Sequence, residues 1–314
     1  MRLLFSFFLF CTFLEAGVSS VDMTPALQNS EYMGIRILDQ KRLSFDKIQG
    51  NSFAELSDLA YHAKTKILYM VSDKGKLFAF NAQFSNTIEL LRPLSSTLLK
   101  NKKGKALRLW KRDGEGLTLD GKGRLLISFE GQAKIGWFHK NSKKYGNLIR
   151  KYTLPKKLQN TKNYRSKNKS LESLAWHIQY GILTATEWPL KKNDKKQHTV
   201  YALSGQEWHF KAEPESKSSL VAMEVMDDGN LLVIERSYTG LMNPFVITLK
   251  KVYIENSKGK MCKTKILAKM NTHRGWDIDN FEGLAKVGKN RYVMISDDNN
   301  NFFQKTLLIY FEVL

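Results

Sequence analysis

The feature that most constrains this chain is a repeated pattern of two short apolar runs bounded by acidic residues. Each copy consists of an acid, an apolar run, a turn with Gly or Asn, a second apolar run and another acid. The clearest copies are 113–130, 171–187 and 280–298. Their acids lie 15 residues apart, in the pairs Glu115/Glu130, Glu172/Glu187 and Glu282/Asp297.

Two weaker copies complete the series. Ser57 and Asp58 stand opposite Asp73, and Leu220 stands opposite Glu235. The five copies recur every 48 to 62 residues, a period typical of solenoids and propellers. Each copy predicts a β-hairpin, because its apolar runs are rich in β-formers and end at Gly, Asn or Asp. A hairpin returns to the end at which it starts, so hairpins arranged radially would bring the acids together around one axis.

Additional apolar runs follow the hairpins, for example Lys134–His139 and Asn147–Leu154. Four strands per unit is the number found in a propeller blade. We therefore predict an all-β fold, a single β-propeller with five visible units and a sixth allowed. Gly34–Phe45 and Thr306–Leu314 are expected to form one blade together, which would close the ring with both termini.

The N-terminal 20 residues have the features of a secretory signal peptide. A basic start is followed by the apolar run Leu3–Leu14 and then by small residues up to Ser20. The run is short for a membrane span, and no later segment is apolar enough to be one. We predict a signal peptide at 1–20, an exposed leader at 21–32 and the propeller domain at 33–314. The expected location is the periplasm or the exterior of the cell, and a monomer is expected.

The chain is strongly basic, with a net charge of +20. Lys140–Lys169 alone holds eleven Lys or Arg and no acid. Nucleic acid is not the expected partner, because the chain is predicted to be exported and its lysines lie in loops without aromatic stacking residues. A small phosphorylated molecule or an anionic envelope component is the expected partner. Adaptation of the surface for solubility is the alternative explanation of the charge.

Four motifs in this order carry a family resemblance: DGEGLTL, NKSLESLA, LLVIERSY and NFEGLAKV with the later ISDDNNNFFQKT. With them the chain resembles the phytase-like family, also described as esterase-like activity of phytase, from about Leu56 to Leu314. The resemblance implies an exported bacterial β-propeller and hydrolysis of phosphate esters. Where the family has Asn-Arg-Gly-Phe-Glu-Gly, the segment Asn168–Ser173 keeps a cation and the carboxylate but has serine in place of both glycines. The family's Asp-Pro-Glu-Gly appears as Asp113–Gly116.

The recurring acids are candidate ligands for a metal ion. Ca²⁺ takes six to eight oxygen ligands and prefers carboxylates to His or Cys. Ca²⁺ is therefore the candidate cofactor, and the ring of acids is the candidate site. The alternative is that each acid caps backbone N–H groups at a blade end or pairs with a neighbouring Lys or Arg. The ring comprises Asp58, Asp73 and Glu235 together with the expected metal ligands Glu115, Glu130, Glu172, Glu187, Glu282 and Asp297.

Glu115, Glu172 and Glu282 each begin an inner strand, and they are the candidate catalytic residues. Cations close to the acids can bind a phosphate group, unless they only pair with the neighbouring carboxylates. A further loop with His and Arg leads into Glu282 and can line a ligand mouth. The candidate substrate-binding residues are Arg112, Lys169, Arg236, His273 and Arg274.

Three classes of function fit these observations. The first is metal-assisted hydrolysis of phosphate esters, in which a metal polarises the phosphoryl group while cations hold its other oxygens. The second is a non-catalytic propeller that binds an anionic envelope component or a partner protein. The third is a lactonase-like propeller with acidic metal ligands. A serine hydrolase is not supported, because the chain has no Gly-x-Ser-x-Gly motif.

Overall fold

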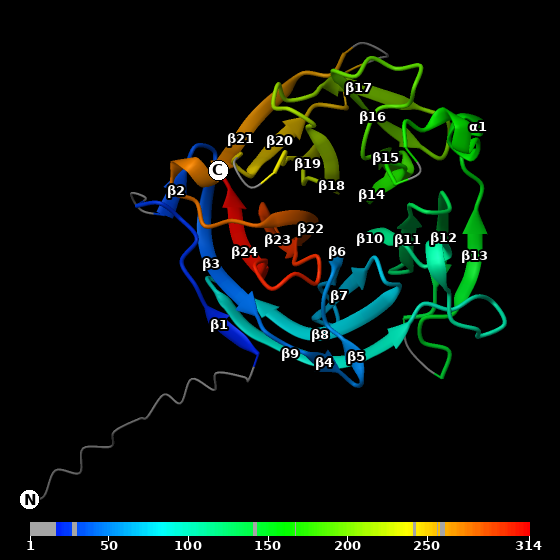
Figure 1. The fold of residues 1–314 in the computed structure, drawn as a ribbon, viewed down its shortest axis with the longest axis horizontal. Coiled ribbons are helices and arrows are strands. Elements are labelled where there is room, and N and C mark those ends of the chain that lie inside the picture. The colour runs from blue at the N-terminus through cyan, green and yellow to red at the C-terminus, as the bar shows by residue number, and fades with distance from the viewer. Residues whose placement is uncertain are drawn as a thin grey trace, which may run out of the picture.

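The structure is a computed structural model that describes residues 17–26, 30–140, 143–166, 168–240, 243–255, 257 and 261–314. Five antiparallel sheets in this part of the chain are arranged around a central axis (Figure 1). The first four are formed by consecutive strands: β6 (Leu56–His62), β7 (Ile67–Ser72), β8 (Lys76–Phe84) and β9 (Ile88–Leu98) in blade one; β10 (Gly114–Leu119), β11 (Leu125–Phe129), β12 (Lys134–Phe138) and β13 (Leu148–Tyr152) in blade two; β14 (Leu171–His177), β15 (Gly181–Thr186), β16 (Gln197–Ala202) and β17 (Glu207–Lys211) in blade three; and β18 (Ser219–Val225), β19 (Leu231–Ser237), β20 (Val246–Val252) and β21 (Thr264–Asn271) in blade four.

Blade five is built from both ends of the chain, as predicted. It combines β22 (Asn280–Gly288), β23 (Arg291–Asp297) and β24 (Thr306–Val313) with β3 (Ile35–Leu43). β24 pairs with β3 from Thr306↔Leu43 to Val313↔Ile35, and Figure 1 shows these two strands side by side. The short strands β1 (Val18–Ser20) and β2 (Glu31–Tyr32) also pair with β3. The prediction of a propeller closed by both termini is confirmed, and the described part of the chain has five blades.

The remaining elements are short. A two-stranded ribbon contains β4 (Lys47–Ile48) and β5 (Asn51–Ser52), and the described helices are α1 (Lys156–Gln159), η2 (Leu109–Lys111), η3 (Thr161–Asn163) and η4 (Thr272–Arg274). None of the helices in the described segments has the length and apolar character that a membrane crossing requires.

The hydrophobic core lies between neighbouring blades. Each blade presents apolar side chains on both faces, because the sheet is covered on both sides. Val71 and Leu77 of blade one, for example, belong to the same buried cluster as Ile127 and Phe129 of blade two. At the axis the inner strands approach closely: a Cβ atom added to Gly116 would lie 2.6 Å from the backbone nitrogen of Leu174. Burial between blades therefore fixes the ring, and small residues allow the inner strands to meet.

The N-terminal region differs in part from the prediction. Residues 1–16 of the predicted signal peptide lie outside the described residues. The segment 21–32 is not an exposed leader throughout, because Met23 is only 1% exposed. Met23 packs in the cluster between blades four and five, and its carbonyl accepts a hydrogen bond from the Asp277 backbone (3.0 Å). Hydrogen bonds from the Val21 and Met23 backbone to Gln40 (3.2 and 2.9 Å) also hold this segment against the ring.

Candidate functional site

The inner strand of every blade contains one β-bulge near its start. In blade two, for example, Gly114 pairs with Phe129 and Leu117 with Ile127, so that Glu115 falls in the irregular stretch. A bulge leaves a residue unpaired and redirects its side chain. The equivalent bulge residues of blades one to five are Ser57, Glu115, Glu172, Val221 and Glu282. At the end of the second strand of each hairpin, or directly after it, stand Asp73, Glu130, Glu187, Arg236 and Asp297.

This register corrects the alignment of blade four. The sequence pattern aligned Leu220 and Glu235 with the acid pairs of the other blades. Leu220 and Glu235 are instead paired directly, and the bulge follows at Val221. The residues equivalent to an acid pair are therefore Val221 and Arg236, so the fourth blade contributes a cation to the ring. Spacing alone missed this because a shift of one residue keeps the distance of 15 between partners.

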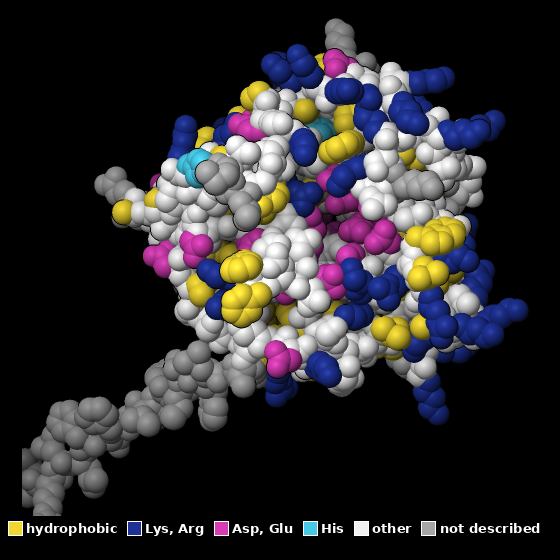
Figure 2. Space-filling view, viewed as in Figure 1, with side chains coloured by type: hydrophobic (Ala, Val, Ile, Leu, Met, Phe, Trp, Pro, Cys, Tyr) yellow, Lys and Arg dark blue, Asp and Glu magenta, His cyan; other side chains and the backbone are white. Residues whose placement is uncertain are grey.

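These positions surround a cavity of about 130 Å³ at one mouth of the central channel. All of them except Val221 line it, together with Lys169. Figure 2 shows acidic side chains gathered around the hollow at the centre of the ring, with Lys and Arg beside them. The radial arrangement predicted from the repeats therefore brings together all six expected metal ligands and two of the expected substrate-binding residues, Lys169 and Arg236.

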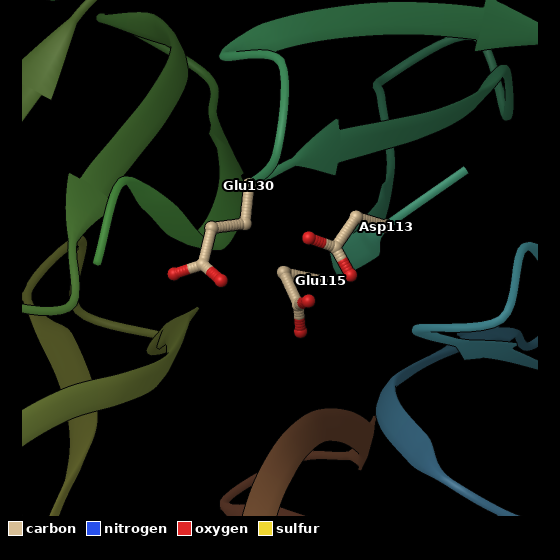
Figure 3. Close-up of side chains that lie close together, drawn as sticks. All are labelled: Asp113, Glu115 and Glu130. Carbon is tan, nitrogen blue, oxygen red and sulfur yellow. The ribbon is translucent and has the colours of Figure 1, made fainter. Parts of the chain in front are cut away.

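One side of the cavity is a cluster of carboxylates that no described cation neutralises, two of which have no partner at all among the described residues. Carboxylate oxygens of Asp113, Glu115 and Glu130 lie within 4.8 Å of one another (Figure 3). Glu130 also forms a second group of this kind with Glu172 and Glu187. Glu115 is 9% exposed and Glu172 is 7% exposed, and neither carboxylate has a hydrogen bond or ion pair with any described residue. Buried polar groups in proteins are almost always hydrogen-bonded, whereas these two carboxylates line the cavity and are open to whatever occupies it.

The electrostatics of this side agree with the geometry. Burial, and then the charge of Glu130, raise the pKa of Glu115 well above its usual range. Burial, and then the charge of Glu187, raise the pKa of Glu172 in the same direction and the pKa of Glu130 to about 8. The like charges stand close together with little water, and a cation among them would reverse these shifts.

The opposite side of the cavity is already neutralised by the protein. The Arg236 guanidinium lies between two acids, donating to Glu187 (3.1 Å) and to Glu282. The Lys169 ammonium pairs with the other oxygen of Glu187. Asp297 accepts a hydrogen bond from the Asn299 backbone (2.7 Å), although burial and then the charge of Glu282 raise its pKa to about 9. The site therefore has an acidic half and an ion-paired half.

Two acids of the predicted ring have structural roles. The buried carboxylate of Asp58 accepts hydrogen bonds from the backbone of Leu117 (2.7 Å) and Leu284 (3.0 Å), and so joins three inner strands. Glu235 lies within blade four, where it pairs with Lys250 (2.5 Å). Burial raises the pKa of Glu235, but the hydrogen bond and charge of His198 and the charge of Lys250 outweigh it and lower the pKa to about 2.

The other candidate residues are dispersed. Arg112 follows η2 and lies close enough to Asp73 to lower its pKa, against the larger effect of burial; it lies outside the lining of the acid cavity. His273 and Arg274 are exposed in η4, also outside that lining. The sequence pattern missed Asp113, which the structure adds to the acidic half. Its place two residues before Glu115, in Asp-Gly-Glu-Gly, was the available signal.

The donor set fits a hard cation. It offers only oxygen ligands, and the two unpartnered buried carboxylates are those whose charge most needs compensation. Asp113, Glu115 and Glu130 would hold the ion, and Glu172 stands beside Glu130 in the second group. Glu187 fits less well, because Lys169 and Arg236 already occupy its two oxygens.

Comparison with known families gives a match over residues 51–300 to the family described as "Phytase-like: Esterase-like activity of phytase". The chain belongs to the phytase-like family. No curated protein matches the sequence. Among solved structures, it is similar to virginiamycin B lyase from Staphylococcus aureus bound to quinupristin (10% identity, TM-score 0.41, covering 95% of this chain and 99% of that one). It is also similar to the β-propeller domain of Cps50 from Myceliophteria thermophila, with 8% identity and a TM-score of 0.44, covering 89% of this chain and 92% of that one. A third similar structure is the PQQ-bound aldose sugar dehydrogenase from Streptomyces coelicolor, with 10% identity and a TM-score of 0.42, covering 95% of this chain and 98% of that one.

Proposed function

We propose that this phytase-like propeller hydrolyses phosphate esters with the help of a bound divalent cation, Ca²⁺ being the first candidate. The observation that carries the proposal is the pair Glu115 and Glu172, two buried carboxylates without partners that face one small cavity. A purely structural acid in this fold has partners, as Asp58 and Glu235 have. Membership of the phytase-like family supports phosphate esters as the substrate class.

The two halves of the site have different tasks in this proposal. When bound, the cation supplies Lewis acidity that polarises the phosphoryl group and lowers the pKa of a water molecule. Asp113, Glu115 and Glu130 would hold and orient that ion, with Glu172 beside Glu130 adding negative charge. Lys169 and Arg236 bind the remaining phosphoryl oxygens, since charge-assisted and bidentate contacts are strong for phosphate. Glu187 and Glu282 keep both cations in position until the substrate arrives.

The test is an assay of the purified chain against phosphomonoesters, phosphodiesters and lactones, with Ca²⁺ or with a chelator. We expect turnover of a phosphate ester that the chelator abolishes and that Glu172→Gln removes. A matched control is Glu224→Gln, a half-buried glutamate on β18 that accepts a hydrogen bond from the Lys286 backbone (3.2 Å) and lines the cavity at the opposite mouth. Turnover of lactones but not phosphate esters would assign the third class of function instead.

A second candidate function is binding of an anionic envelope component without catalysis. It is favoured by the net charge of +20 and by the Lys and Arg side chains spread over the face in Figure 2. Export to the periplasm or exterior belongs to this proposal and to the first, and it rests on the apolar run Leu3–Leu14. Binding of anionic lipid vesicles that persists in Glu115→Gln and Glu172→Gln, with no turnover of any ester, would favour this candidate.

A further inference from the structure

A second, larger cavity opens directly beside the acid cavity. Its volume is about 820 Å³, in the range of pockets that hold a small organic molecule, whereas the acid cavity of about 130 Å³ has room for little more than an ion and a phosphoryl group. The two cavities share Lys169, Glu187 and Arg236 in their walls. We call the larger one the bowl. Any ester with its phosphoryl group between Lys169 and Arg236 must place its organic group in or near the bowl.

The bowl belongs to one side of the mouth only. Its walls come from blades three, four and five, whereas the unpartnered carboxylates come from blades two and three. The cations shared by both cavities stand between them. A substrate that spans this boundary would meet the cation-binding acids at its phosphoryl end and the bowl at its other end.

Aromatic side chains form part of the wall of the bowl. The Tyr238 and Phe245 rings stack with centroids 4.1 Å apart and an angle of 5° between their planes. The Trp188 indole N–H donates to the Ser219 hydroxyl (2.8 Å), which fixes that ring as well. Phe303 is 84% exposed although it is large and apolar. These rings are held at the surface of a cavity rather than in the core, an arrangement suited to stacking against a flat ligand.

The charges of the bowl favour an anionic ligand. Four cations line it, namely Lys169, Lys217, Arg236 and Lys305. Its three acids all have partners: Glu187 pairs with Lys169 and Arg236, Asp279 accepts from the Lys305 backbone and the Gln304 side chain (both 2.8 Å), and Asp277 pairs with Lys305 (3.2 Å). Lys217 has no side-chain partner in the described part of the chain.

We infer that the bowl binds the organic group of the phosphate ester, and that this group carries a flat ring. Tyr238 and Phe303 are the specificity-determining side chains that contact the ring, and Lys217 adds positive charge at the rim. This inference rests on the proposed function, because it places the phosphoryl group at Lys169 and Arg236.

The test uses two phosphonates that cannot be hydrolysed, phenylphosphonate and methylphosphonate, titrated calorimetrically into the purified chain with millimolar Ca²⁺. We expect phenylphosphonate to bind about tenfold more tightly, the size of one good aromatic contact. Tyr238→Ala and Phe303→Ala should each reduce this preference and leave the affinity for methylphosphonate unchanged. Tyr253→Ala is the matched control, because Tyr253 and Tyr238 are both 37% exposed but Tyr253 lies outside the bowl.

The outcomes separate the two proposals. Equal affinities for both phosphonates, insensitive to Tyr238→Ala and Phe303→Ala, would overturn the bowl as a ring-binding site and leave the phosphate site standing. Absence of binding by either phosphonate would overturn the proposed function and the inference with it. Misfolding cannot explain a loss in Phe303→Ala, since this side chain is almost fully exposed.

Discussion

Glu172 and Glu235 are both buried glutamates on strands of the same ring, yet their surroundings are opposite. Glu235 is 1% exposed and is enclosed by Lys250, Ser218, His198 and the Glu213 backbone. Glu172 is 7% exposed and has no partner among the described residues. A buried carboxylate without partners costs stability, whereas a fully paired one need not. The difference separates acids that hold the fold from the acids proposed to bind a ligand.

The largest expected effect comes from breaking the buried ion pair between Glu235 and Lys250. Lys250→Met should reduce the free energy of unfolding by about 3–5 kcal/mol, because it leaves the buried Glu235 without its cation. Glu213 also loses this partner but keeps Lys269 (3.2 Å). Urea denaturation measures the change. The control Lys251→Met removes the exposed pair with Asp228 and should cost less than about 1 kcal/mol. Equal losses of stability in the two variants would show that the buried pair Glu235–Lys250 stabilises the fold no more than the exposed pair does.

Substitution of the unpartnered glutamates, Glu115 and Glu172, should increase stability instead of reducing it. Glu115→Gln and Glu172→Gln should raise the melting temperature of the metal-free chain, because each replaces a buried carboxyl group, whose ionised form is disfavoured there, by a neutral amide of the same size. Both should abolish stabilisation by Ca²⁺, which for the unmodified chain is about 2.7 kcal/mol at a hundredfold excess over Kd, and should reduce turnover about 100-fold.

Glu282→Gln sharpens this comparison, because Glu282 pairs with Arg236. Glu282→Gln should weaken phosphonate binding more than Ca²⁺ binding. In this it should differ from Glu115→Gln and Glu172→Gln, although all three glutamates lie near the start of an inner strand. Melting curves with Ca²⁺, Mg²⁺ and Mn²⁺ measure the metal effect, and elemental analysis shows whether a metal is already bound. If Glu115→Gln and Glu172→Gln lower the melting temperature while metal binding and turnover persist, these residues are blade caps.

A smaller effect is expected from pH. The folded pKa of Glu130 is about 8, above its ordinary value of 4.5. A carboxyl group with a raised folded pKa binds a proton more tightly in the folded state, so stability falls as pH rises from about 4.5 to 8. The metal-free chain should therefore melt lower at pH 8 than at pH 6. The contribution of Glu235, whose folded pKa is about 2, is complete above pH 4.5 and is lost as pH falls toward 2. Saturating Ca²⁺ should abolish the fall in melting temperature between pH 6 and 8. If the melting temperature falls equally with Ca²⁺, Glu130 is not a metal ligand.

The smallest effect is expected at the dispersed candidates. His273→Ala and Arg274→Ala alter exposed residues of η4 that line neither cavity. Each should leave turnover within about twofold, as is usual for surface changes away from a site. Steady-state kinetics on the best phosphate ester measures this, with Lys169→Met as the comparison expected to fail. A tenfold loss in Arg274→Ala would move the substrate toward η4.

Most of the fold could be predicted from the sequence, because hairpins and their period depend on local patterns. The three acid pairs at Glu115, Glu172 and Glu282 also followed, since a hairpin returns its ends to one place. Blade four could not be aligned, because the bulge that distinguishes Val221 from Leu220 depends on pairing between strands and not on composition. The division into paired and unpartnered acids also depends on tertiary contacts. Arg236 reaches Glu282 across 46 residues of sequence.

The pairing of β3 with β24 has a consequence for how the molecule is made. Hairpins such as β6–β7 need only local sequence and can form while the chain is still being synthesised. β3 can pair with β24 only after residues 306–313 have been synthesised, because Leu43 pairs with Thr306. Such distant pairing is slow, and until it happens two strand edges stay open to other chains. A chain that stops early never acquires the fifth blade, nor Glu282 and Asp297 at the channel mouth. The candidate site is therefore complete only once β22, β23 and β24 have joined the ring, and the same step covers the open strand edges.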